Sequence, residues 1–67
     1  MIFVNGQPTD LAAPATIREV LIGVDIDPET TGIAVAVDAE VATRGMWPTQ
    51  EVADGARVEI VTATQGG

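Results

Sequence analysis

The residues best placed to do chemistry lie at the end of the chain, where residues 58–63 lead into Thr64-Gln65-Gly66-Gly67. Residues 58–63 are rich in Val and Ile and are typical of a β-strand, whereas the two final glycines carry no Cβ atoms. A rigid strand that continues into a slender terminus can be threaded into another protein. We therefore interpret the Gly67 carboxylate as the candidate reactive group and Gly66 as the residue that lets it thread.

Side chains that commonly drive catalysis are missing, because the sequence holds no His, Cys, Ser, Tyr or Lys. These types supply most of the nucleophiles and general bases of enzymes. Pairs of carboxylates could act as acid and base, but ten acids in so small a chain meet by chance. We also expect no pocket large enough for a substrate. The sequence therefore predicts a protein that is not an enzyme and has no catalytic residues of its own.

Three acids at alternate positions, Asp25, Asp27 and Glu29, resemble the start of a calcium-binding loop. Such a loop needs Gly at its sixth position and Glu at its twelfth, where this chain has Thr30 and Ala36. The cluster is better explained as the end of a helix. No metal site is predicted.

Charge and composition limit the partners. Ten acidic residues against three arginines give a net charge of -7, which repels the phosphates that dominate nucleic-acid binding. The acids either keep an apolar domain in solution or steer it toward a basic surface. No apolar run reaches the roughly 20 residues of a membrane span, and no basic signal-peptide start is present. We expect a soluble, cytoplasmic monomer that binds neither nucleic acid nor membranes.

The first half of the chain predicts a β-hairpin followed by a helix. Residues 1–4 are β-prone and run into Asn5-Gly6, a pair that tolerates positive φ, so residues 9–12 are expected to form the returning strand. Thr16 and Glu19 are spaced for a reciprocal capping box, so a helix should begin at Thr16. Its apolar stripe should comprise Ile17, Val20, Leu21 and Val24, and Gly23 with the residues 25–28 that follow should end the helix.

The second half predicts three strands. Residues 33–38 alternate large and small apolar side chains, residues 41–43 form a brief strand, and residues 57–63 form the last one. Trp47, between them, is expected to cover an edge of the core rather than to bind a ligand. The order ββαβββ predicts an α+β fold with one helix on a mixed sheet of about five strands, whose first and last strands are central and parallel.

Strand periodicity also predicts a docking surface. Successive strand residues point to opposite faces, so one set of apolar side chains should face away from the helix and be free to meet a partner. These residues are Phe3, Ala34, Ala36 and Val61.

Several segments together resemble the ThiS family of sulfur carriers, small ubiquitin-like β-grasp proteins of thiamine biosynthesis. The resemblance covers nearly the whole chain and is most specific where the last strand meets the terminal diglycine. The family often has Asn-Gly or a similar pair where Asp38-Ala39 stands, and a Pro where Thr43 stands. The matching residues are those of the opening hairpin (residues 2–6), the strand of residues 33–38, Arg44, Trp47, residues 54–61, Gly66 and Gly67.

The resemblance implies one β-grasp domain over residues 1–67, with residues 64–67 as a flexible tail. It further implies that Gly67 is adenylated and then converted to a thiocarboxylate that donates sulfur for thiazole formation. A ThiF/MoeB-like adenylating enzyme, using ATP and Mg, and a cysteine desulfurase would load the sulfur, and thiazole synthase would receive it. The chain itself would bind no cofactor.

Two alternatives stay open on the sequence alone. A carrier with the same chemistry could serve another acceptor, such as the molybdopterin or cysteine pathway. Alternatively, the chain could be a β-grasp binding module whose diglycine is incidental, or a protein modifier that forms isopeptide bonds. Because the chain has no Lys, lysine-linked chains of this protein are excluded.

Overall fold

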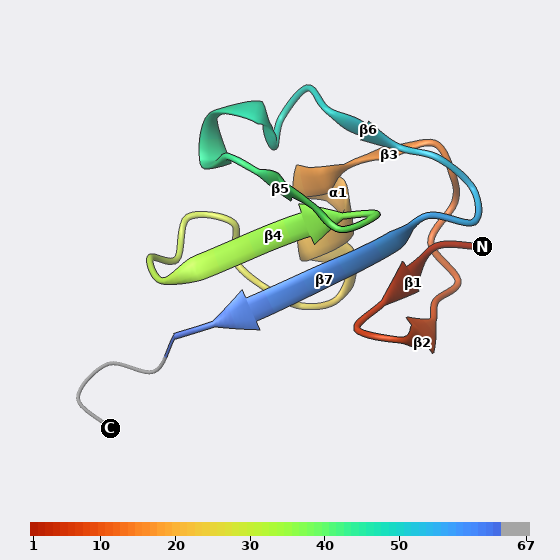
Figure 1. Cartoon of the computed structure of the whole chain (residues 1–67), viewed down its shortest axis with the longest axis horizontal. Coiled ribbons are helices and arrows are strands. Elements are labelled where there is room, and N and C mark those ends of the chain that lie inside the picture. The colour runs from red at the N-terminus through yellow and green to blue at the C-terminus, as the bar shows by residue number, and fades with distance from the viewer. Residues whose placement is uncertain (64–67) are drawn as a thin grey trace.

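The computed structural model describes residues 1–63, which contain seven strands, one α-helix and one turn of 3₁₀-helix (Figure 1). The helix and five of these strands follow the predicted order ββαβββ. Most of the strands are short. The elements are β1 (Phe3–Val4), β2 (Gln7–Pro8), β3 (Ala15–Thr16), α1 (Ile17–Gly23), β4 (Ile33–Val37), β5 (Glu40–Ala42), η1 (Arg44–Met46), β6 (Glu51–Val52) and β7 (Arg57–Thr62).

The main sheet has five strands in the order β2-β1-β7-β4-β5. β1 and β7 pair in parallel, and the other neighbours pair antiparallel. The prediction of a mixed sheet whose first and last strands are parallel is confirmed, and of these two strands β7 occupies the centre while β1 lies between it and the edge strand β2. β7 lies at the centre of the sheet and pairs with β4 over five residues, so the strand that carries the chain toward its terminus is the best supported one.

Helix α1 begins where the capping box predicts. The Thr16 hydroxyl accepts a hydrogen bond from the Glu19 N–H at 3.1 Å, and the Thr16 N–H donates to the Glu19 carboxylate at 2.8 Å. The next two free N–H groups of the helix start are used as well, because Ile17 donates to the Gln50 carbonyl and Arg18 to the Trp47 carbonyl. These bonds fix the start of a helix too short to be stable alone.

Figure 1 shows α1 behind β4 and β7, where it covers one face of the main sheet. We call this the inner face and the opposite side the outer face. The helix buries Ile17, Val20 and Leu21. They pack with the inward side chains of the sheet, Ile2, Val4, Val35, Val58 and Ile60, and with Trp47 and Val52, to form one core.

Two predicted strands are misplaced, and two-residue turns explain both errors. The returning strand of the first hairpin is Gln7–Pro8 rather than residues 9–12, because Asn5 (φ 50°) and Gly6 (φ 81°) reverse the chain at once and pair Val4 with Gln7. Likewise β5 begins at Glu40 rather than at Val41, since positive φ at Asp38 and Ala39 makes a second tight turn. Both turns are shorter than the sequence interpretation allows.

A second, two-stranded sheet was not predicted. β3 and β6 pair antiparallel, with Ala15 opposite Val52 and Thr16 opposite Glu51. Each strand has two residues, too few to show an alternating pattern. The predicted role of Trp47 is confirmed: its side chain is buried, and its indole N–H donates to the Ala42 carbonyl at 3.1 Å.

No helix among residues 1–63 is long and apolar enough to span a membrane.

Candidate functional site

The predicted reactive residues Gly66 and Gly67 lie outside the described residues, as does the rest of the predicted tail, residues 64–67. The structure instead shows the base from which the terminus leaves. That base is the end of β7, whose residues Val58 to Thr62 pair with β4 on one side. The candidate site is therefore built around the end of the central strand.

The last described residue is held from the β4 side. The Ala63 N–H donates to the Gly32 carbonyl at 2.7 Å, directly before β4 begins. Gly32 has φ +80°, and a Cβ atom added to it would lie 3.2 Å from the Ala63 carbonyl oxygen. Gly32 therefore combines a backbone conformation that L side chains rarely adopt with close backbone packing. These backbone contacts hold the chain in place at Ala63, directly after the end of β7.

Asn5 holds the same strand from the β1 side. Its side-chain amide donates to the Ile60 carbonyl at 3.1 Å, and its side-chain oxygen accepts from the Ile60 N–H at 2.8 Å. The Asn5 backbone N–H donates to the Val58 carbonyl at 2.8 Å. We refer to the two side-chain bonds as the Asn5 clamp. It joins residues 55 positions apart in the chain.

Three of the four predicted docking residues come together on the outer face. Ala34 of β4 pairs with Val61 of β7, and two residues further along β4, on the same face, Ala36 pairs with Glu59. They surround a shallow depression of about 360 Å³, which we call the outer hollow. The outer hollow is lined by Ala34, Val35, Ala36, Ala39, Val41, Glu59 and Val61.

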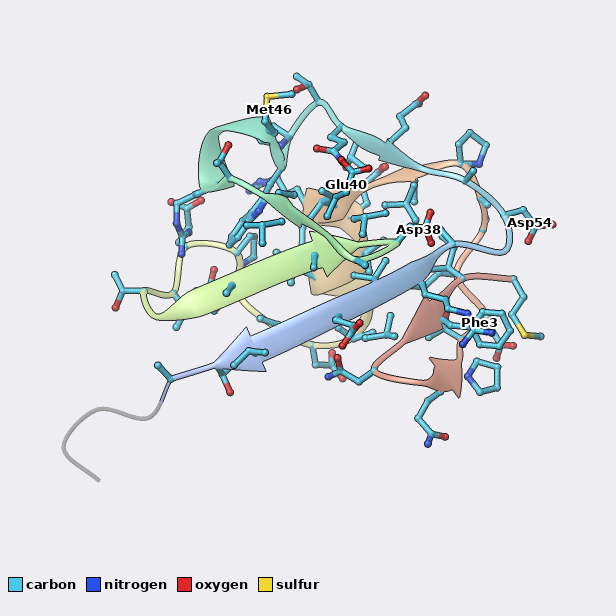
Figure 2. All side chains as sticks on the ribbon, viewed as in Figure 1. Phe3, Asp38, Glu40, Met46 and Asp54 are labelled. Carbon is cyan, nitrogen blue, oxygen red and sulfur yellow. The ribbon has the colours of Figure 1, made fainter. Side chains whose placement is uncertain are left out.

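Phe3 does not join the outer hollow. It pairs with Arg57, the first residue of β7, and its ring lies 5.7 Å from the Arg57 guanidinium. Figure 2 shows Phe3 near the end of the sheet opposite to the arrowhead of β7. The strand period does place Phe3 on the face away from α1. In the register of the structure, however, two charged residues of β7, Arg57 and Glu59, separate Phe3 from Val61. The docking role of all four residues stays a prediction.

Val41 also lines the outer hollow, and it is the most exposed apolar residue there that the sequence interpretation missed. It is 80% exposed, and Val61 is 64% exposed, although both side chains are apolar. Val41 lies opposite Ala36 in the β4–β5 pair, so it extends the apolar surface to the edge strand. The sequence holds a signal for Val41. If residues 38 and 39 are taken as a two-residue turn, Val41 lies opposite Ala36 and on the same face of the sheet. An uncovered cluster of this kind is typical of a surface that meets another protein.

Acidic residues lie in and beside the outer hollow. All ten acidic residues are exposed, and Glu59 lies in the lining of the outer hollow itself. Figure 2 shows Asp38 and Glu40 at the β4–β5 turn, and Ala39, which stands between them in the sequence, lines the outer hollow. Among residues 1–63 the only ion pair joins the Met1 amino group to Asp54. The acids therefore leave most of their charge uncompensated and available to a basic partner.

The Arg44 and Trp47 pair lies away from the outer face. The Arg44 guanidinium is 4.4 Å from the centre of the Trp47 ring, and it donates to the carbonyls of Pro28 (2.5 Å) and Thr30 (2.6 Å). These bonds tie η1 to the loop that leads into Gly32. Arg44 therefore supports the segment that contacts Ala63, and its guanidinium is already engaged with backbone oxygens.

The described residues offer no enclosed polar site: within residues 1–63, no polar or charged residue is buried. The arrangement can present a terminus and an apolar, acidic face to another protein. A second depression, of about 190 Å³, lies beside Arg44 and Trp47, and its charged lining residues are Arg18, Glu29 and Arg44.

Comparisons with known proteins agree with this description. The chain is similar to the crystal structure of a thiamine biosynthesis protein (ThiS) from Geobacter metallireducens, with 26% sequence identity and a TM-score of 0.77, covering 98% of this chain and 97% of that one. It is also similar to an NMR solution structure of a thiamine biosynthesis protein from the same organism, with 28% identity and a TM-score of 0.76, covering 98% of this chain and 86% of that one.

A comparison with curated protein sequences gave no match. The family model described as "ThiS family", in contrast, matches residues 2–67, almost the entire chain. This match agrees with the mixed five-stranded sheet, the single helix and the strand that leads to the diglycine. The chain belongs to the ThiS family.

Proposed function

We propose that this chain is a sulfur carrier of thiamine biosynthesis whose Gly67 carboxylate is the point of attachment. The observation that carries the proposal is the support of β7, which is central in the sheet and is held at Ile60 by Asn5 and at Ala63 by Gly32. Four residues, ending in Gly66-Gly67, follow this fixed point in the sequence. The family membership and the two similar thiamine biosynthesis proteins support the same pathway.

The proposed chemistry starts from a carboxylate, which is a poor electrophile. Attack of a Gly67 carboxylate oxygen on the α-phosphorus of ATP releases pyrophosphate and forms an acyl adenylate. A persulfide sulfur then attacks the acyl carbon, and AMP leaves with the bonding electrons. Cleavage of the resulting acyl persulfide by a second thiol, which forms a disulfide with the donor's sulfur, leaves a thiocarboxylate on Gly67.

Partner enzymes perform each of these steps in the proposal. A ThiF/MoeB-like adenylating enzyme supplies the ATP site and Mg, a cysteine desulfurase supplies the persulfide, and thiazole synthase accepts the sulfur. Ala34, Ala36 and Val61 form the proposed docking surface for the adenylating enzyme, because they line an exposed apolar hollow on the strand pair nearest the terminus. Phe3 belongs to a separate contact with Arg57.

Intact-mass measurement tests the proposal. The full chain is incubated with an adenylating enzyme, ATP, cysteine and a cysteine desulfurase, and we expect the mass change of one oxygen replaced by one sulfur. A variant that lacks Gly67 should keep its fold, checked by circular dichroism, and should gain no sulfur. An unchanged mass of the full chain, with enzymes that load another ThiS-family carrier in parallel, would overturn the proposed function.

A further inference from the structure

The two sides of β7 are supported unequally. On the β4 side, pairing extends over five residues, from Val58 to Thr62. On the opposite side, β1 pairs only with Arg57 and Val58, because the chain turns away at Asn5. The last four residues of β7 therefore extend past the end of β1, on the stretch that leads to the terminus.

The Asn5 clamp occupies this open side at Ile60, two residues beyond Val58, the last residue of β7 that pairs with β1. A primary amide has the same donor and acceptor as a peptide group, so one side chain can bind the N–H and the carbonyl of a single residue. Asn5 does this with Ile60, at 2.8 Å and 3.1 Å. Its side chain therefore acts as one more residue of β1, placed where β1 itself has ended.

The backbone at position 5 restricts which residue can do this. Asn5 has φ 50°, a conformation in which Asn and Gly are favoured over most residues. Gly would fit the turn but has no side chain, and Asp would offer acceptors only, with an oxygen facing the Ile60 carbonyl. Asn meets both demands, since it tolerates the turn and supplies a donor and an acceptor.

We propose that Asn5 is a positioning residue for loading of the terminus. The inference rests on the function proposed above, in which an adenylating enzyme must receive the Gly67 carboxylate. By fixing Ile60 from the side that β1 leaves open, the Asn5 clamp sets the direction in which β7 leaves the body of the protein. Its loss changes how often the carboxylate reaches the reactive position, and leaves the outer hollow intact because Asn5 does not line it.

Asp38 provides a matched control at the other end of the strand. It also lies in a two-residue turn with positive φ (49°), and its carboxylate accepts a hydrogen bond from the Arg57 N–H at 3.0 Å. Figure 2 places Asp38 at the end of the sheet away from the arrowhead of β7. Asn5→Gly and Asp38→Gly therefore each remove a side-chain contact to β7 and each relax a positive-φ position. Only the first acts near the terminus.

The effect of each variant on adenylation is measured as the rate at which a purified adenylating enzyme exchanges pyrophosphate into ATP in the presence of the carrier. For Asn5→Gly we expect the maximal rate to fall about tenfold, the factor expected for loss of a net hydrogen-bond contribution, while the half-saturating carrier concentration stays unchanged. Asp38→Gly should retain the wild-type maximal rate, and any effect of losing its charge beside the outer hollow should fall on the half-saturating carrier concentration alone. Asn5→Asp should also lose rate, because it keeps only the acceptor.

Amide hydrogen exchange on the free carrier checks the clamp directly. The Ile60 amide should exchange about tenfold faster in Asn5→Gly and should be unaffected in Asp38→Gly, while the Arg57 amide should show the reverse pattern. Equal losses of maximal rate in the two glycine variants would show a general effect of stability and overturn the proposal. An unchanged maximal rate in Asn5→Gly would overturn it as well.

Failure of the proposed function gives a different result. In that case the wild-type carrier stimulates no pyrophosphate exchange by an enzyme that responds to another ThiS-family carrier, and the positioning role falls with the reaction it serves. The amide exchange still decides whether Asn5 holds Ile60, because that measurement needs no enzyme. Loss of rate confined to the Asn5 variants, together with faster Ile60 exchange, supports the proposal.

Discussion

The two faces of the central sheet carry similar residue types but meet different surroundings. On the inner face, Val35, Val58 and Ile60 are buried beneath α1. On the outer face, Val61 and Val41 are 64% and 80% exposed, although they are equally apolar. Because nothing among the described residues covers these two side chains, they contribute little to the free energy of folding. The inner face therefore stabilises the protein, and the outer face is left available for binding.

Substitutions at two adjacent residues of β7 test whether the two faces differ in their contribution to stability. Ile60→Ala removes a buried side chain and should lower the free energy of unfolding by about 3 kcal/mol. Val61→Ala removes an exposed one and should change it by no more than about 0.5 kcal/mol. Urea denaturation followed by Trp47 fluorescence measures both. Similar losses in the two variants would show that the outer face is also part of the stabilising core.

A charge on the outer face should affect binding and spare stability. Ala36→Arg places a long cationic side chain beside the outer hollow, and we expect the affinity for the adenylating enzyme to fall about tenfold, or about 1.4 kcal/mol. The thermal midpoint should stay at the wild-type value, since Ala36 is not in the buried core. A titration with unchanged affinity would exclude this part of the sheet as the docking surface.

A substitution in the turn between β4 and β5 should stabilise the protein without changing any residue of the inner face. Ala39 has φ 70°, which is costly for a residue with a Cβ atom. Ala39→Gly should therefore stabilise the protein by about 0.5–1 kcal/mol, after the entropy cost of Gly is subtracted. Thermal and urea unfolding measure the gain. A loss of stability would mean that the Ala39 methyl group packs usefully in the outer hollow.

The smallest expected effect concerns charge at a distance. A net charge of -7 should raise the rate of encounter with a basic partner surface, and added salt screens that attraction. Stopped-flow association with the adenylating enzyme should slow about threefold as salt rises through the physiological range, with dissociation little changed. A flat association rate would mean that the acids on the outer face do not steer the partner.

Local patterns predict the inner face well. The Thr16–Glu19 capping box and the alternation of residues 33–37 depend on residues close in sequence, and both appear where expected. The parallel pairing of β1 with β7 follows from the placement of β-prone segments at the two chain ends. The family match and the similarity to a solved ThiS structure agree with the fold that this physical argument predicts.

Features that depend on distant residues could not be predicted in the same way. The Asn5 clamp joins positions 55 residues apart, and nothing around Asn5 in the sequence indicates Ile60 as its partner. β3 and β6 are too short to show a period. The one-residue error at β5 concealed Val41 as part of the outer hollow, because a shift of one residue moves a side chain to the other face.

The two edges of the main sheet bear on how this protein behaves at high concentration. An open apolar face next to unpaired strand edges invites stacking into fibres. Here one edge, β2, is two residues long and contains Pro8, which cannot donate a backbone hydrogen bond to a neighbouring strand. The other, β5, has three residues and begins with the exposed carboxylate of Glu40. Both edges therefore resist edge-to-edge growth, so the outer face can stay uncovered for a partner without seeding aggregation.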